Sequence, residues 1–313
     1  MKRFYRMVSS MRFGLALMGL GAAFLGVGGL LVEGGVADTL VFRVLLGIVL
    51  VNMAACTVNQ TVQFAKSFGR GESGAKKTRR AALIALHGGI VLVLLGGAFN
   101  KFEGFGEKVL LFQGESADIA AISEGKYPYS LTVNGFTIEY NSNRTASQYF
   151  VDITMNDAEQ EERLTLSVNA PASYRGVKIY YSEYFNLYQI NTLTKEGRFR
   201  QTECWEKEYA ELPEDAQTAL MPLAYDPGVE NDETRPPLVF HALANGEEEE
   251  RILHAELGKW YDLEPGLFYQ FGKVKPHVVL AVKAQPGNGL CAFGAFLIFA
   301  GTLLAFFRKK EGS

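Results

Sequence analysis

The chain has 313 residues, of which 48% are hydrophobic and 21% are charged, and its formal net charge is −3. This composition excludes a single water-soluble globular domain and indicates membrane spans joined to a soluble part. The three cysteines, Cys56, Cys204 and Cys291, form no CxxC pair, which excludes a c-type haem attachment motif and a thiol-disulfide oxidoreductase motif.

Four apolar runs are long enough to cross a hydrocarbon core of roughly 30 Å as helices. They cover residues 13–32, 41–62, 82–99 and 289–307. The sequence therefore predicts an N-terminal membrane region at 1–100, an extracytoplasmic domain at 101–288 inserted between the third and fourth helices, and a final helix with a basic tail at 289–313.

Basic residues favour one orientation, because loops rich in Lys and Arg stay cytoplasmic. They cluster before the first run, between the second and third runs, and after the fourth: Lys2, Arg3, Arg6, Arg12, Lys66, Arg70, Lys76, Lys77, Arg79, Arg80, Arg308, Lys309 and Lys310. Both termini are therefore expected in the cytoplasm. Segment 101–288 carries 30 acidic and 17 basic side chains, so its net charge of −13 favours a basic partner and disfavours nucleic acid.

The first run also fits a cleaved signal peptide, since it has a basic start and small residues. Its length and the glycines Gly14, Gly21 and Gly28, spaced by seven residues, favour a retained helix with a close-packing face. In the second run Asn52 and Cys56 share one helix face, which indicates hydrogen bonding and packing between helices.

The third run contains one ionisable residue, His87, followed by Gly88 and Gly89. An ionisable side chain inside a span is costly and is therefore a candidate functional residue. A neutral imidazole is the form that ligates metals, while the alternative is a histidine that only hydrogen-bonds a neighbouring helix. The two glycines remove side chains at this level, where a flat macrocycle could approach closely.

The extracytoplasmic segment reads as an all-β domain, a sandwich or barrel. An Asn134-Gly135 pair predicts a hairpin turn, and residues 203–236, acidic and proline-containing, predict a loop or inserted lobe. Short strands are expected at 149–155, 163–168, 177–181, 187–193, 238–243, 252–257, 267–271 and 277–282. His241, His254 and His277 fall in these strands without a zinc spacing, and no catalytic motif is present.

Several motifs together resemble the ResB family of system II cytochrome c biogenesis. They are SMRFGLAL entering the first span, Asn52 with Cys56-Thr57, His87-Gly88 followed by LVLLGG, GEKVLLFQGES, and LTLSVNAPASYRGVKIYYSEY at 164–184. The order of four spans with a large domain before the last also fits this family.

The resemblance implies a subunit that acts with a CcsA/ResC-type partner to carry haem b across a bacterial cytoplasmic membrane, or its organellar equivalent, and to present it for thioether attachment to apocytochrome c. It implies that His87 is one axial haem ligand and that the partner supplies the second. The chain would then be a non-catalytic or co-catalytic subunit of the haem lyase complex.

Two alternatives stay open. One is a membrane-tethered β-domain scaffold or binding module without a cofactor. The other is the anchor of a b-type electron-transfer complex, which is disfavoured because such anchors supply paired intramembrane histidines.

Overall fold

The computed structural model describes residues 9–31, 36, 39–141, 145–157, 159–214, 216–228, 236–245 and 251–310. The chain divides into a helical unit, Met1–Phe105 with Ala284–Ser313, and a strand unit, Gly106–Lys283. These boundaries fall within a few residues of the expected ones at 100/101 and 288/289. Lys2, Arg3 and Arg6, used above for orientation, lie outside the described residues.

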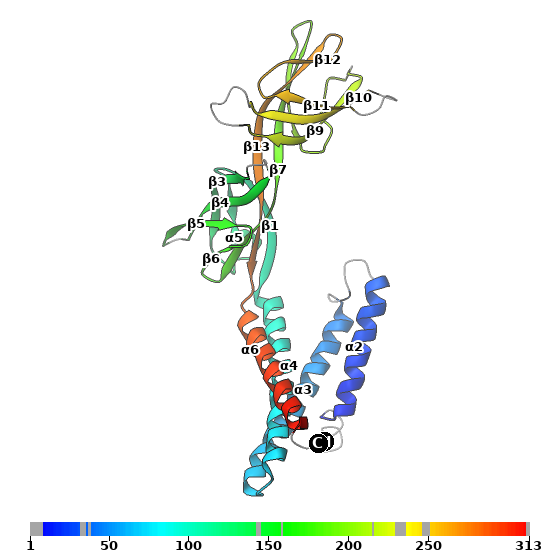
Figure 1. Ribbon diagram of the computed structural model, residues 1–313, viewed down its shortest axis with the longest axis vertical. Helices are drawn as coiled ribbons and strands as arrows, with labels where there is room; N and C mark the ends of the chain where they lie inside the picture. The colour runs from blue at the N-terminus through cyan, green and yellow to red at the C-terminus, as the bar shows by residue number, and fades with distance from the viewer. Residues whose placement is uncertain are drawn as a thin grey trace. The chain divides into compact units, whose positions relative to one another are not determined.

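The described part of the helical unit contains the long helices α2 Met11–Leu31, α3 Leu40–Gly69, α4 Gly74–Glu103 and α6 Asn288–Lys310 (Figure 1). Among the described residues, three of these helices are long and apolar enough to cross a membrane, and the apolar part of α2, Arg12–Gly28, is shorter. The expected four spans are therefore supported for three helices. This finding supports an integral membrane protein.

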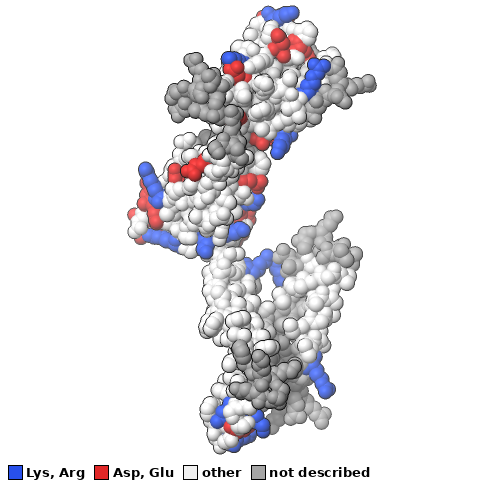
Figure 2. Space-filling model, in the orientation of Figure 1, with Lys and Arg blue, Asp and Glu red and all other residues white. Residues whose placement is uncertain are grey.

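The connection between α3 and α4 is short. Helix α3 continues to Gly69 and α4 already begins at Gly74. Arg80 closes this turn, because its guanidinium donates to the Gln63 carbonyl at 2.6 Å and pairs with Glu72 at 3.2 Å. Figure 2 shows Lys and Arg side chains gathered at the turn and few charged atoms along α4 and α6.

Glycines set the contacts between helices. A Cβ placed on Gly14 of α2 would lie 2.5 Å from Asn52 Oδ1 of α3, and one on Gly21 would lie 3.5 Å from Leu45. The expected close-packing face of the first helix is therefore confirmed at these two positions. A side chain at Gly14 would require the Asn52 side chain to move.

A second line of glycines joins α4 to α6. A Cβ on Gly89 would lie 2.6 Å from the Gly294 carbonyl oxygen, and one on Gly96 would lie 2.7 Å from the Gly287 carbonyl oxygen. We call these four residues the glycine seam. Because backbones approach this closely only without side chains, the seam fixes α4 against α6.

The strand unit is a large antiparallel β domain. A six-stranded sheet has the order β1-β13-β7-β6 with β12 on β13 and β8 on β7, and two further sheets have the orders β2-β3-β4-β5 and β11-β10-β9. The strands are β1 Phe105–Phe112, β2 Ser116–Asp118, β3 Ser130–Tyr140, β4 Ala146–Asn156, β5 Glu161–Ser167, β6 Ala172–Tyr174, β7 Val177–Thr194, β8 Phe199–Trp205, β9 Thr218–Asp226, β10 Leu238–Asn245, β11 Arg251–Glu256, β12 Tyr261–Glu264 and β13 Leu267–Ala284, and the short helix α5 covers Ile119–Ile122. The β-rich expectation is confirmed, while closure as a sandwich or barrel stays a prediction.

Two strands run much further than the sequence predicts. β7 unites the strands expected at 177–181 and 187–193, and β13 unites those expected at 267–271 and 277–282. The first half of β7 pairs with β6 and the second half with β8. Different partners at the two ends therefore keep one strand extended through a segment whose local sequence resembles a turn.

The hairpin turn predicted at Asn134-Gly135 is wrong. β3 continues through it, and its register with β4 shifts between Val133 and Gly135 as a β-bulge. The Asn134 amide donates to the Thr154 hydroxyl at 2.8 Å on the neighbouring strand. A glycine inside a strand marks a bulge as readily as a turn, and cross-strand pairing decides between them.

The loop predicted at 203–236 is also wrong in part. It contains β9, whose residues pair with β10 from Asp226↔Leu238 to Thr218↔Asn245. Alternating residues in the first half of β9 are buried, and Pro222 is one of them. Residues 215 and 229–235 of this segment lie outside the described part of the chain.

Candidate functional site

His87 lies in the middle of α4 and is half-buried. Its Nδ1 lies 2.8 Å from the carbonyl oxygen of Leu83, one turn earlier in the same helix. A carbonyl oxygen can only accept a hydrogen bond, so Nδ1 carries the proton in this contact. The lone pair then resides on Nε2, which is the nitrogen left to bind a metal.

The two glycines after His87 have different surroundings. The position of a Cβ on Gly89 is filled by α6, with Gly294 O at 2.6 Å and Ile298 Cγ1 at 2.7 Å. The position of a Cβ on Gly88 meets only Thr57 Cγ2, at 3.8 Å. Gly89 therefore serves the contact between helices, and Gly88 is the residue that leaves room beside α4.

An apolar groove of about 570 Å³ runs along this open side. Its walls come from α3, α4 and α6 and include Thr57, Phe64, Gly88 and Leu297. His87 itself is not among the lining residues. The groove and the histidine therefore occupy neighbouring faces of α4.

Within the described part of the helical unit, both cysteine thiols are already engaged in hydrogen bonds. Cys56 Sγ donates to the Ser9 carbonyl at 3.3 Å, and Cys291 Sγ donates to the Val93 carbonyl at 3.6 Å. The interhelical role expected for Cys56 is thereby confirmed. The described residues contain no group of three His, Cys, Asp or Glu that could hold a metal ion, and His87 is the one histidine of this unit.

The three histidines of the strand unit lie on strands, as expected, and apart from one another. His241 is fully buried, its Nδ1 lies 3.2 Å from the Val239 carbonyl, and its Nε2 lies 2.7 Å from the Tyr269 hydroxyl. Burial lowers the pKa of His241 below its usual 6.5. His277 is 8% exposed and packs edge-on against Trp205, whereas His254 is exposed on β11.

The turn between β6 and β7, which belongs to the motif at 164–184, is held by one carboxylate. Asp157 accepts a hydrogen bond from the Tyr174 hydroxyl at 2.8 Å and pairs with Arg175 at 2.6 Å. Hydrogen bonds from the backbone N–H of Glu159 and then from Tyr174 lower the pKa of Asp157. Arg175 and Gly176 have positive φ values of 42° and 90°, so the motif specifies a tight turn fixed to the β4–β5 connection.

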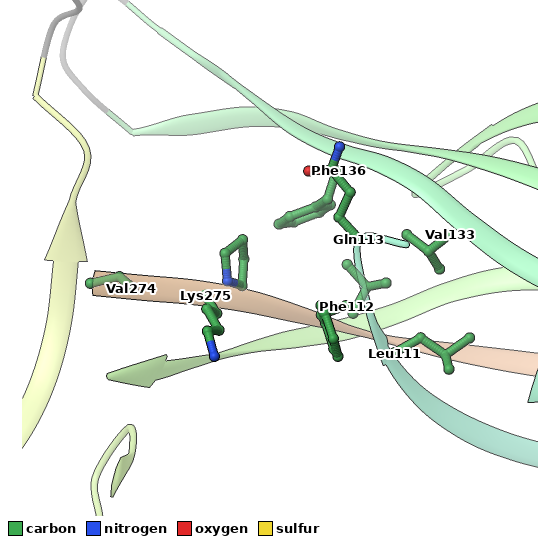
Figure 3. A pocket seen from close by; sticks show the side chains of 9 residues that line it. Leu111, Phe112, Gln113, Val133, Phe136, Val274 and Lys275 are labelled. Carbon is green, nitrogen blue, oxygen red and sulfur yellow. The ribbon is translucent and has the colours of Figure 1, made fainter. Parts of the chain in front are cut away.

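The strand unit also contains two pockets that sequence reasoning missed. The first, about 350 Å³, is formed by side chains from β1, β3 and β13 that converge in Figure 3, among them Phe112, Phe136 and Lys275. The second, about 270 Å³, shares Phe136 and Pro276 with the first. The one sequence signal was the repetition of aromatic residues in FTIEY and YYSEY, on strands whose pairing was unknown.

Comparisons with known proteins agree with the resemblance given above. The model of the ResB-like family matches residues 72–227. The cytochrome c biogenesis protein Ccs1 of Pyropia yezoensis is 37% identical over 113 residues, which are 34% of this chain and 26% of that protein. The cytochrome c biogenesis protein CcsB of Thermosynechococcus vestitus is 32% identical over 113 residues, with the same two shares.

These alignments span about a quarter of each curated relative. Among solved structures, the cytochrome c haem lyase CcmF aligns with 94% of this chain, and the alignment covers 34% of the CcmF chain. The identity is 13% and the TM-score is 0.35, so this similarity supports no inference about function. The family match covers the α3–α4 turn, all of α4 with His87, and the strand unit as far as β9. The resemblance to the ResB family is therefore confirmed, and the chain is ResB-like over residues 72–227.

Proposed function

We propose that this chain is a membrane subunit of a system II cytochrome c biogenesis complex. In this role it moves haem across the membrane with a CcsA/ResC-type partner and presents it for thioether attachment to apocytochrome c. The ResB-like match and the membrane-length helices support the proposal. The observation that carries it is the state of His87, whose Nδ1 is engaged with Leu83 and whose Nε2 retains its lone pair.

Haem is the cargo in this proposal, and His87 is one of its two axial ligands. The fixed Nδ1 contact orients the imidazole ring in the way that a carbonyl partner orients a metal-bound histidine. Of the two glycines expected to allow close approach, Gly88 remains available, since α6 occupies the space beside Gly89. The remaining histidines lie in the strand unit, so the second ligand is assigned to the partner.

The orientation follows from charge. Basic residues at the α3–α4 turn favour the cytoplasm for that turn, so the strand unit is proposed to lie outside and both termini inside. The membrane is proposed to be the bacterial cytoplasmic membrane or its organellar equivalent. His87 then binds haem on the cytoplasmic side of the bilayer midplane, with the chain as a non-catalytic or co-catalytic subunit.

The test is haem content. The chain is copurified with a CcsA-like partner, and Soret absorbance per complex is compared for the wild type, His87→Gly and His254→Gly. His254 is the matched control, because it is an exposed histidine outside the helical unit. We expect His87→Gly to lose most of the haem and His254→Gly to keep it.

Imidazole distinguishes a ligand from a packing residue. Added imidazole should restore Soret absorbance to His87→Gly, since it can occupy the space of the missing ring and bind the iron. Undiminished haem in His87→Gly contradicts the assignment of His87. A wild-type complex with no Soret absorbance contradicts the proposal and favours the scaffold without a cofactor.

A further inference from the structure

The second pocket of the strand unit, about 270 Å³, is unusual in being walled by aromatic rings. Four strands contribute to it: β3, β7, β9 and β13. Its lining includes Phe136, Tyr140, Tyr184, Asn186, Tyr225 and Pro276. Tyr140 is 45% exposed, so the pocket is open to a ligand from solution.

Two of the aromatic rings that line this pocket pack against each other and against tyrosines outside the lining. Phe136 lies 5.3 Å from Tyr184, and both contact Tyr149, at 6.3 and 5.7 Å between ring centroids. Tyr149 in turn stacks on Tyr181 at 5.2 Å. Because the wall is packed before any ligand arrives, binding would cost little ordering of these side chains.

Two carboxylates adjoin residues of the pocket lining without lining the pocket themselves. Glu206 accepts a hydrogen bond from the lining residue Asn186 at 2.8 Å, and Asp226 directly follows the lining residue Tyr225. Burial, together with neighbouring tyrosines and Glu206, raises the pKa of Tyr184 to about 12. Burial and then the negative charge of Asp226 raise the pKa of Tyr140. The tyrosines therefore stay neutral, and both carboxylates act on the pocket.

Aromatic faces combined with carboxylates select a cation. The faces of the rings carry the negative part of the aromatic quadrupole and attract an ammonium or guanidinium group. The nearby Lys275 does not fill this role, because its ammonium pairs with Glu203 at 2.8 Å. The strand unit as a whole carries 29 acidic and 16 basic side chains, so its field attracts a basic polypeptide.

We propose that this pocket is an aromatic cage that binds a lysine or arginine side chain of a partner polypeptide. The neighbouring 350 Å³ pocket, which shares Phe136 and Pro276 with the cage, would receive an adjacent apolar side chain of the same extended segment (Figure 3). This inference concerns the strand unit and does not rest on haem binding by His87.

The test uses the full chain in detergent micelles and a fluorescein-labelled peptide of alternating lysine and alanine, with binding followed by fluorescence anisotropy. A peptide with Nε-acetyl-lysine at every lysine position is the uncharged control. We expect the acetylated peptide to bind far more weakly. Equal binding of the two peptides overturns the proposal.

Variants separate the cage from the general acidity of the unit. Tyr140→Leu should weaken binding of the lysine peptide about two- to fivefold, whereas Tyr140→Phe, which keeps a ring, should stay near wild type. Tyr209→Leu removes an exposed tyrosine outside the pocket and should leave affinity unchanged. Wild-type affinity in Tyr140→Leu, or an equal loss in Tyr209→Leu, overturns the proposal.

The acidic edge is tested in the same way. Asp226→Asn should weaken binding more than Glu211→Gln, because Asp226 adjoins the lining residue Tyr225, whereas Glu211 is an exposed carboxylate that pairs with Arg200. Equal losses would mean that only long-range charge acts, which overturns the cage. Haem content, measured in parallel, should stay unchanged in all these variants, so failure here is distinguishable from failure of the haem proposal.

Discussion

The glycine seam allows a sharp test of how the helical unit is held together. Gly89→Ala adds one methyl group to α4. Its carbon would lie 2.6 Å from the Gly294 carbonyl oxygen and 2.9 Å from the Ile298 nitrogen, whereas ordinary contacts begin near 3.4 Å. These are backbone atoms, so no side chain can turn away. Helices α4 and α6 must therefore separate by about 0.8 Å at this point.

Gly89→Ala should lower the free energy of unfolding, because it overpacks the contact at Gly89 and loosens the packing along the rest of the glycine seam. Small-to-large changes in a packed interior cost about 1–3 kcal/mol. For the helical unit, a loss of this free energy corresponds to a fall of roughly 3–10 °C in the midpoint temperature of unfolding. Gly97→Ala is the matched control, because nothing lies within 4 Å of its added methyl group and alanine favours a helix.

The assay follows the thermal unfolding of purified protein in detergent with a thiol-reactive dye. A Cys204→Ala background removes the cysteine of the strand unit, so that the dye reports on Cys56 and Cys291 in the helical unit. We expect Gly89→Ala to unfold several degrees earlier than the background and Gly97→Ala to unfold at the same temperature or later. Equal midpoints for the two variants would refute the packing argument.

Three further predictions concern other parts of the chain. Tyr269→Phe leaves the buried Nε2 of His241 without its hydroxyl donor, so the strand unit should lose about 1–3 kcal/mol of stability, measured by urea unfolding. Because burial lowers the pKa of His241, this histidine binds a proton more readily in the unfolded state than in the folded state. The free energy of unfolding should therefore be at its full value above about pH 6.5 and should fall as the pH drops below that value. His241→Gln should weaken this pH dependence. Arg80→Met should lower the midpoint of the helical unit, whereas Arg79→Met, at an exposed neighbouring position, should not; equal shifts would mean that net charge alone acts.

Local sequence was sufficient to predict the long apolar helices, three of which are long enough to cross a membrane. In a bilayer every backbone polar group must be paired within its own segment, so a long apolar run forms a helix whatever its neighbours are. For the same reason His87 stood out as a costly residue inside such a run. Regular glycine spacing also revealed the packing face of α2, whereas the seam between Gly89 and Gly294 joins residues about two hundred positions apart and gave no local signal.

Strands depend on partners that sequence alone does not reveal. Asn134-Gly135 has the composition of a hairpin turn, yet pairing along β4 holds it as a bulge, and different neighbours keep β7 and β13 extended through segments of turn-like sequence. The sequence by itself determined the helices, the β class of the strand unit and the family resemblance, and it singled out His87 as a candidate residue. Only the tertiary structure decided which glycines face another helix and which tyrosines share a pocket. These features depend on distances between residues far apart in the chain, and such distances are set by packing and not by local preference.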